Sequence, residues 1–246
     1  MEQLRQSKHQ FAFYSIDFFE ELVCKNSIFI LNEQELVHRA LRVIKLSKGD
    51  SFIIFNQAQH VELEIVSCTK KEITVLVLSC QKNNVFKRQI TFLLPLLKKE
   101  ALEAAVYSLT EIGVNVIQLV MTQKSRKAAI SDREMKRLNK IIIAAAEQSK
   151  NYNFPVINQP VHLPVYLESI SSTSQRVLFD ELGKSFFEVK KSISENKLYL
   201  TVGPEGGLSD QELSLLQQHD FVVCSLTKTV LRSLQAVAIG SALFRL

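Results

Sequence analysis

Hydrophobic and polar residues alternate over short stretches in the first third of the chain. Runs of β-branched and aromatic residues, several with a period of two, predict strands at residues 11–14, 27–31, 51–56, 61–69 and 72–79. A helical pattern over residues 33–43 interrupts them, and Lys48-Gly49-Asp50 predicts a turn before the third strand. Many short strands in so small a space favour a compact barrel or sandwich.

The pattern changes after Gln89, where apolar strand-like runs begin to alternate with helical segments. Strands are predicted at residues 90–94, 114–121, 176–179, 198–202 and 221–226, and helices at residues 98–112, 132–148, 209–219 and 230–246. Gly113 follows the first helix, where a left-handed cap is expected. The prolines at 155, 160 and 164 predict a loop followed by a short helix. This alternation is typical of a parallel α/β sheet.

A polar stretch over residues 81–88 separates the two patterns and indicates a linker. The sequence therefore predicts an α/β protein of two domains, residues 1–82 and 83–246. The 246 residues contain no uncharged apolar run of about 18, so no membrane-spanning helix is expected. The polar start of the chain does not resemble a secretory signal, and we expect a soluble, cytoplasmic protein without a membrane partner.

Composition narrows the chemistry further. The four cysteines form no C-x-x-C pair and the five histidines have no ligand spacing, so no metal is predicted. The net charge of +5 is concentrated in one segment: residues 124–150 hold eight basic and three acidic residues, and the rest of the chain is balanced. A basic stripe on a neutral body is compatible with a surface for a polyanion such as RNA, and equally with a solvated helix face.

Three of only seven glycines lie within five residues, in Gly203-Pro204-Glu205-Gly206-Gly207. The cluster follows a predicted strand, and Ser209 with Glu212 has the spacing of a capping box that begins a helix. A strand, a tight turn and a capped helix form a crevice at the carboxyl edge of a parallel sheet, where open α/β folds bind ligands. Neither the P-loop nor the dinucleotide fingerprint is present. The acidic Glu205 favours a cationic or donor-rich ligand, and glycines let the backbone approach a flat heterocycle.

This segment resembles a motif of the RsmE family, SPOUT-class methyltransferases that modify N3 of a uridine in small-subunit ribosomal RNA. Four further matches occur in the order of the family pattern: His38-Arg39-Ala40-Leu41-Arg42, Thr110-Glu111-Ile112-Gly113-Val114, Ala145-Ala146-Glu147-Gln148-Ser149 and Leu231-Arg232-Ser233. The similarity therefore covers nearly the whole chain.

The resemblance implies an N-terminal PUA-like β-barrel for RNA and a C-terminal SPOUT α/β domain with a trefoil knot, an exception to unknotted topology. It also implies that S-adenosyl-L-methionine (SAM) binds in the knot and that a homodimer completes the site. Transferred to this sequence, the cofactor-binding residues are Phe179, Asp180, Glu181, Val202, Gly203, Pro204, Glu205, Gly206, Gly207, Leu226, Leu231, Ser233 and Ala236.

Arg232 is the candidate catalytic residue. Uracil N3 must lose its proton before methylation, the resulting charge spreads onto the carbonyl oxygens, and an arginine is always cationic and forked. The candidate RNA contacts are Arg39, Arg42, Lys124 and Arg126, although packing or solvation accounts equally well for the first two. The expected partner is small-subunit ribosomal RNA or the assembled subunit.

The chain departs from the family pattern at several positions. Leu234 stands where the family commonly has glutamate, Tyr107-Ser108 replaces Gln-Lys, and Lys124 replaces an arginine. A leucine has no charge, and lysine cannot copy a bidentate arginine. Two alternatives therefore stand beside (uracil-N3)-methylation of 16S ribosomal RNA: an RNA-binding relative with weakened catalysis, and a SPOUT methyltransferase acting on another RNA position.

Overall fold

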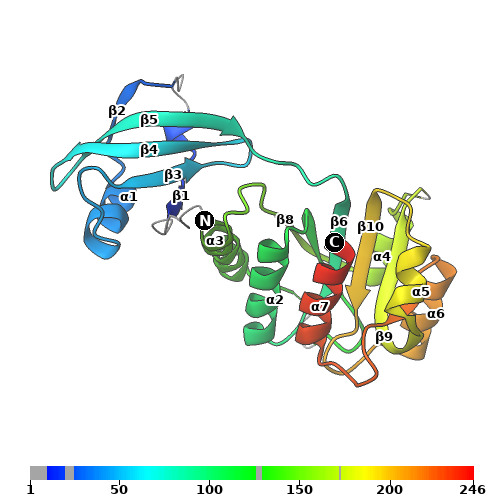
Figure 1. Ribbon diagram of the computed structural model, residues 1–246. Helices are drawn as coiled ribbons and strands as arrows, with labels where there is room; N and C mark the ends of the chain where they lie inside the picture. The colour runs from blue at the N-terminus through cyan, green and yellow to red at the C-terminus, as the bar shows by residue number, and fades with distance from the viewer. Residues whose placement is uncertain (1–9, 20–24, 126–128, 172) are drawn as a thin grey trace. The chain divides into compact units, whose positions relative to one another are not determined.

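Two sheets organise the chain, one in each of two compact units. The computed structural model describes residues 10–19, 25–125, 129–171 and 173–246, and Figure 1 shows the course of the chain. The first unit comprises Met1–Val85 together with Glu147–Asn153, and the second comprises Phe86–Ala146 and Phe154–Leu246. A short segment near the middle of the sequence thus returns to the first unit, which the hydrophobic pattern does not predict.

The first unit contains a five-stranded sheet in the order β1-β3-β4-β5-β2. Its strands are β1 (Phe11–Tyr14), β2 (Ile28–Leu31), β3 (Ser51–Phe55), β4 (Gln59–Cys68) and β5 (Ile73–Lys82). β1 pairs with β3 in parallel and the other pairs are antiparallel. Alternate residues of β4 (Val61, Leu63 and Ile65) are fully buried, as its period of two predicts.

The predicted barrel is not found closed in the described part of the chain. β1 and β2 form the two edges of an open sheet. A 3₁₀ turn (Asp17–Phe19) follows β1, and α1 (Gln34–His38) continues into a π-helical turn (Arg39–Val43) where a single helix was predicted. The core of the unit includes Leu36, Val37 and Ala40 from this helical segment, packed with Phe13 and Phe52.

The second unit contains a six-stranded sheet in the order β11-β9-β10-β6-β7-β8, and every pairing in it is parallel. The strands are β6 (Gln89–Pro95), β7 (Val116–Met121), β8 (Val156–His162), β9 (Gln175–Ser185), β10 (Lys197–Val202) and β11 (Val222–Ser225). The helices are α2 (Lys99–Ile112), α3 (Asp132–Ser149), α4 (Leu163–Glu168), α5 (Phe186–Lys191), α6 (Asp210–Gln218) and α7 (Ser233–Arg245). The predicted parallel α/β arrangement is confirmed.

Three elements of the second unit differ from the sequence prediction, and one of them, α5, was not predicted. The proline-rich stretch predicted as a loop forms β8, and Pro160 lies inside it. A proline is tolerated there because β8 is an edge strand of the sheet, where a missing backbone donor breaks no ladder on the outer side. β9 continues beyond the apolar core into an exposed polar extension, and its pairing with β11 shifts register between Val223 and Cys224.

Helix ends agree with the sequence. Gly113 ends α2 in the left-handed conformation at φ 86°, and a Cβ there would lie 2.5 Å from the ring of Phe86, so two constraints require glycine. α3 buries Met135, Leu138 and Ile142 on one face. No helix in the described residues combines the length and apolar character needed to cross a bilayer.

Candidate functional site

The glycine-rich segment lies at the centre of the carboxyl edge of the second sheet. It follows β10, which is flanked by β9 and β6, and it leads into α6. The capping box is confirmed: Ser209 Oγ accepts a hydrogen bond from the backbone N–H of Glu212, and Glu212 Oε2 accepts one from the Ser209 N–H at 2.9 Å. The helix start is therefore fixed immediately after the turn.

Three other segments hold the glycine-rich turn in place. Ser233 Oγ, at the start of α7, donates to the Gly203 carbonyl at 2.8 Å. Lys124 Nζ, from the segment after β7, donates to the Leu208 carbonyl at 3.2 Å. The backbone N–H of Lys98, at the start of α2, donates to Glu205 Oε1 at 3.0 Å. The turn is thus connected to the carboxyl ends of β6 and β7 as well as to α7.

Glu205 has a role that the sequence did not predict. Its carboxylate accepts a bond from the N-cap residue of α2, where the helix dipole favours a negative charge. The sequence interpretation treated this carboxylate as a feature selecting a cationic ligand. The contact explains why an acidic side chain suits this turn even without a ligand.

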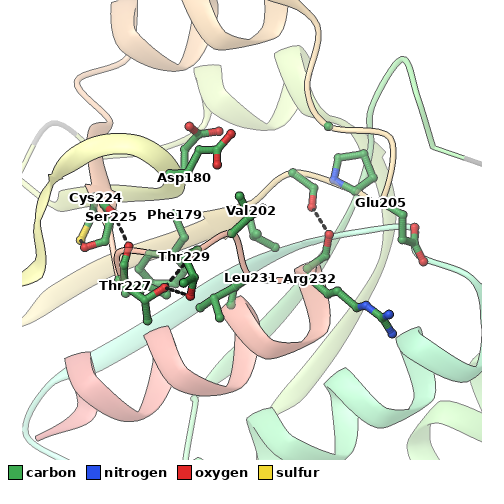
Figure 2. A pocket seen from close by; sticks show the side chains of 18 residues that line it. Phe179, Asp180, Val202, Glu205, Cys224, Ser225, Thr227, Thr229, Leu231 and Arg232 are labelled. Atoms are coloured by element: carbon green, nitrogen blue, oxygen red, sulfur yellow. Dashed lines mark hydrogen bonds between the residues drawn. The ribbon is translucent and has the colours of Figure 1, made fainter.

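A cavity of about 420 Å³ opens beside the turn, a size typical of small-molecule sites. Three chain segments line it, from the middle of β9, the end of β10 with the turn that follows, and the region from β11 to α7 (Figure 2). Thirteen of the fourteen residues predicted for cofactor binding and catalysis are among the lining residues, namely Phe179, Asp180, Glu181, Val202, Gly203, Pro204, Glu205, Gly207, Leu226, Leu231, Arg232, Ser233 and Ala236. Gly206 is not among them and lies against the Lys124 side chain instead.

The cavity has an apolar wall and a polar rim. Val202 and Ala236 are buried, and with Leu231 they contribute apolar side chains to the lining. Arg232 is exposed, and its side chain extends away from this wall. Asp180 also lines the cavity, and its carboxylate is held in place by a hydrogen bond from the Leu182 N–H at 3.0 Å.

Five lining residues between the end of β11 and α7 were not predicted from the sequence: Cys224, Ser225, Thr227, Thr229 and Val230. Ser225 Oγ donates to the Thr227 carbonyl at 2.9 Å, and Thr227 Oγ1 donates to the Thr229 carbonyl at 2.6 Å, so the segment folds onto itself. Cys224 also lines the cavity, and burial raises the pKa of its thiol to about 11. The run of hydroxyl residues after an apolar strand is a sequence signal that could have drawn attention to this segment.

Gly240 allows α7 to approach the cavity wall closely. A Cβ at this position would lie 2.3 Å from Phe179 Cε2, far inside van der Waals contact. The Phe179 ring also contacts Phe244 at a centroid distance of 5.7 Å. Glycine is therefore needed at position 240 so that α7 can pack against Phe179 in the cavity wall.

The candidate RNA contacts have different environments. Arg39 forms a bidentate pair with Glu147, with its nitrogens 2.5 and 3.0 Å from the carboxylate oxygens, and its guanidinium lies 5.2 Å from the Phe13 ring centre. Arg42 is exposed. Lys124 holds the glycine-rich turn, as described above, and Arg126 lies outside the described residues. For Arg39 and Lys124 the structure thus provides an intramolecular role.

No cluster of three or more metal-ligating side chains occurs among the described residues. The site therefore consists of a cavity bounded by backbone turns, an apolar wall, carboxylates and one exposed arginine.

Comparison with known proteins places this site in a family. Residues 84–244 match the family model described as an RNA methyltransferase domain, which covers most of the chain and includes the whole cavity. The chain belongs to this RNA methyltransferase family. The ribosomal RNA small subunit methyltransferase E of Rickettsia conorii is 25% identical over 236 residues, which are 95% of this chain and 96% of that protein. The enzyme of the same name from Bacillus subtilis is 26% identical over 89% of this chain and 90% of its own length. The resemblance to the RsmE family is confirmed.

Solved structures of similar proteins agree in fold. The ribosomal RNA small subunit methyltransferase E of Neisseria gonorrhoeae, solved bound to S-adenosyl methionine, superposes with a TM-score of 0.81 over 95% of this chain and 96% of that chain, at 19% identity. A Legionella pneumophila structure with bound SAM gives a TM-score of 0.80 at 22% identity, over 97% of this chain and 98% of that chain. These similarities establish a mixed α/β fold shared with members of the methyltransferase family.

Proposed function

We propose that this protein is a SAM-dependent methyltransferase that modifies N3 of a uridine in 16S ribosomal RNA. The observation that carries the proposal is the cavity: the three segments assigned to the cofactor by the RsmE resemblance, although far apart in the sequence, line one space of suitable size. The family membership and the relatives named ribosomal RNA small subunit methyltransferase E support the same activity.

The residues present fit SAM. Val202, Leu231 and Ala236 provide an apolar surface for the adenine, and the turn at Gly203 brings backbone groups close enough to contact a heterocycle. Asp180 and Glu181 supply carboxylates suited to ribose hydroxyls or to the cationic part of the ligand. When bound, SAM supplies an electrophilic methyl group on a sulfonium.

Arg232 acts on the RNA side of this arrangement. Its guanidinium, exposed at the cavity, holds the uracil carbonyl oxygens, which carry the negative charge once N3 has lost its proton. Because arginine remains protonated throughout the physiological range, this stabilisation does not depend on a proton transfer. Positioning and charge stabilisation are two contributions of the protein to this transfer, in which the N3 proton passes to solvent.

We further propose the finer features that the resemblance implies. The open sheet of the first unit is a PUA-like RNA-binding module spanning residues 1–82, and residues 83–246 form a SPOUT domain whose C-terminal segment is knotted. The knot rests on the RsmE resemblance, and the bond from Ser233 to Gly203 joins the start of α7 to the turn after β10. A homodimer is supported by large exposed apolar side chains in the second unit: Leu182, Phe187 and Val230 are each more than 70% accessible, and Val230 lines the cavity. Its place of action is the cytoplasm, where the small subunit is assembled.

Two measurements test the proposed reaction. Mass mapping of 16S ribosomal RNA from a deletion strain should show one unmethylated uridine that the intact gene restores. Unchanged uridine methylation would contradict the assignment, and loss of a ribose or other methyl group would favour a different RNA position. Absence of SAM binding by calorimetry would favour an RNA-binding relative without turnover.

Substitution of Arg232 tests its role. Arg232→Ala should reduce methyl transfer by about 100-fold or more while leaving SAM affinity within a few-fold, because the guanidinium acts on the acceptor. Lys228→Ala is the matched control, since Lys228 is a cation on the same segment that does not line the cavity. Retained turnover in Arg232→Ala would refute the assignment.

A further inference from the structure

Among the described basic residues of segment 124–150, some form contacts within the protein and others are exposed to solvent. Lys124 is bound to the glycine-rich turn, and Arg137 forms a bidentate pair with Glu103 of α2. The side chains of Arg133, Lys136 and Lys140 on α3 remain exposed. Among the described residues of this segment, most of the exposed unpaired positive charge therefore lies on α3.

These three cations occupy one face of the helix. Spacings of three and four residues place them within about 60° of each other around the helix axis and over about 10 Å along it. The opposite face of α3 is buried through Met135 and Leu138. We call Arg133, Lys136 and Lys140 the α3 basic face.

Few acidic groups neutralise this face. Of the two carboxylates in the first turn of α3, Glu134 is used locally, since its Oε2 accepts a bond from Ser131 Oγ at 2.9 Å. Asp132 lies one turn before Lys136 and can offset part of its charge. Lys140 has no acidic residue three or four positions away on either side.

The direction of α3 places this face at the functional edge of the sheet. β10, β6, β7 and β8 are parallel, so the segment after β7 leaves the sheet at the same edge as the glycine-rich turn, and α3 begins there. Lys124 in that segment contacts the turn directly. Arg133 and Lys136 are therefore near the beginning of a helix that starts on the cavity side.

α2 lies between α3 and α7 and begins with exposed lysines beside the acidic Glu100. It packs against α7 and is joined to α3 by the Arg137–Glu103 pair, and Figure 1 shows the three helices on one side of the sheet. Lys98 and Lys99 are exposed at the start of α2, at the same edge. Cations thus lead along this edge from Arg232, the N-cap of α7, to the α3 basic face.

We infer that the α3 basic face binds the sugar–phosphate backbone of the RNA that flanks the target nucleotide. The inference rests on the proposed function, because it requires an RNA strand at the cavity. A row of exposed lysine and arginine side chains along one helix face is suited to the evenly spaced phosphates of a strand. The face therefore contributes affinity and orientation without reading sequence.

The variant Arg133→Gln/Lys136→Gln/Lys140→Gln tests this, since glutamine is nearly as good a helix former as lysine. The control, Lys87→Gln/Lys191→Gln/Lys197→Gln, removes the same charge from exposed sites in the same unit, with Lys197 at the amino end of β10. Binding of a fragment of small-subunit ribosomal RNA is measured from 50 to 200 mM salt. Over this range the wild type should lose about 20-fold more affinity than the α3 variant, because three phosphate contacts are missing. The control variant should keep the wild-type salt dependence.

The expected kinetic result is a higher KM for RNA with kcat and SAM affinity unchanged. Equal effects of the two variants, or no effect of either, would overturn the inference. The protein could bind RNA with the expected salt dependence and yet methylate no RNA. That result would reject the proposed function and still support RNA binding by the α3 basic face. If the α3 variant does not fold, acetylation of the unaltered protein decides: bound RNA should protect Lys136 and Lys140 and leave Lys191 and Lys197 reactive. Equal labelling with and without RNA would overturn the inference.

Discussion

Glu147 is predicted to stabilise the first unit, although it lies in the motif Ala145-Ala146-Glu147-Gln148-Ser149 that accompanies the methyltransferase domain. Its Oε1 accepts bonds from the backbone N–H of Tyr14 and from Arg39, both at 3.0 Å, and its Oε2 accepts the second bond from Arg39. The carboxylate side chain is only 11% exposed, whereas that of Arg39 is 37% exposed. Replacing Glu147 therefore removes three charge-assisted hydrogen bonds at a partly buried position.

Two substitutions separate these contributions. Hydrogen bonds to charged groups contribute about 1.5–3 kcal/mol net, and the exposure of Arg39 calls for a value at the lower end for its pair. Glu147→Gln keeps an oxygen that can accept from Tyr14 and loses the charge, so we expect a loss of about 1–2 kcal/mol. Glu147→Ala also leaves the Tyr14 N–H without this acceptor, and the expected loss is about 2–3 kcal/mol.

A double-mutant cycle between Arg39 and Glu147, followed by urea denaturation, measures the pair itself, and hydrogen exchange of the β1 segment reports the Tyr14 contact. We expect a coupling of about 1–2 kcal/mol. The Arg137–Glu103 pair is the matched control: its geometry is also bidentate, but its arginine is 58% exposed, and its coupling should be smaller. A coupling near zero for Arg39 and Glu147, with weaker RNA binding by Arg39→Ala, would refute this reasoning and make Arg39 a phosphate contact.

Two further predictions concern buried titratable groups. Tyr152 packs against Phe55 and His60 at centroid distances of 4.7 Å, and its buried hydroxyl has no partner among the described residues. Tyr152→Phe should therefore leave the free energy of unfolding, measured by thermal denaturation, unchanged or raise it by up to about 1 kcal/mol. Burial raises the pKa of Tyr152 to about 12, so as the pH rises the unfolded chain loses the hydroxyl proton before the folded protein does. The wild type should therefore lose stability between pH 10 and 12 to a greater extent than Tyr152→Phe. Equal stability profiles of the two proteins over this pH range would contradict the prediction. The Cys224 thiol, with its pKa raised to about 11, should resist alkylation at pH 8 while the exposed Cys68 reacts. Peptide mass mapping measures both labelling rates, and equal rates would show that the Cys224 thiol is accessible.

Local features of the fold followed from the sequence. The capping box at Ser209, the left-handed Gly113 and the parallel α/β alternation each depend on residues close together in the chain, and all three are confirmed. Residues of the cavity were named by motif, and the structure brings all but Gly206 to one place. Their roles toward SAM and RNA stay predictions.

What the sequence missed depends on partners distant in the chain. For Arg39 the sequence left open a phosphate contact and a packing or solvation role, and it did not show the pair with Glu147, 108 positions away. Nor did it show the bond from the Lys98 N–H to Glu205, a cavity-lining residue 107 positions further along the chain. A single sequence holds no record of such neighbours. The β8 strand was missed because proline is a strand breaker in general, and its tolerance at Pro160 depends on sheet position.

The return of residues 147–153 to the first unit has a consequence for how this protein can be divided. Three crossings of the backbone join the units, so no single cut yields two complete halves. A fragment ending at Val85 would lack both the carboxylate that anchors Arg39 and the aromatic ring that covers Phe55. The first unit is therefore not a detachable module that could be transplanted by simple end-to-end fusion, because its residues 147–153 follow directly on α3 of the other unit.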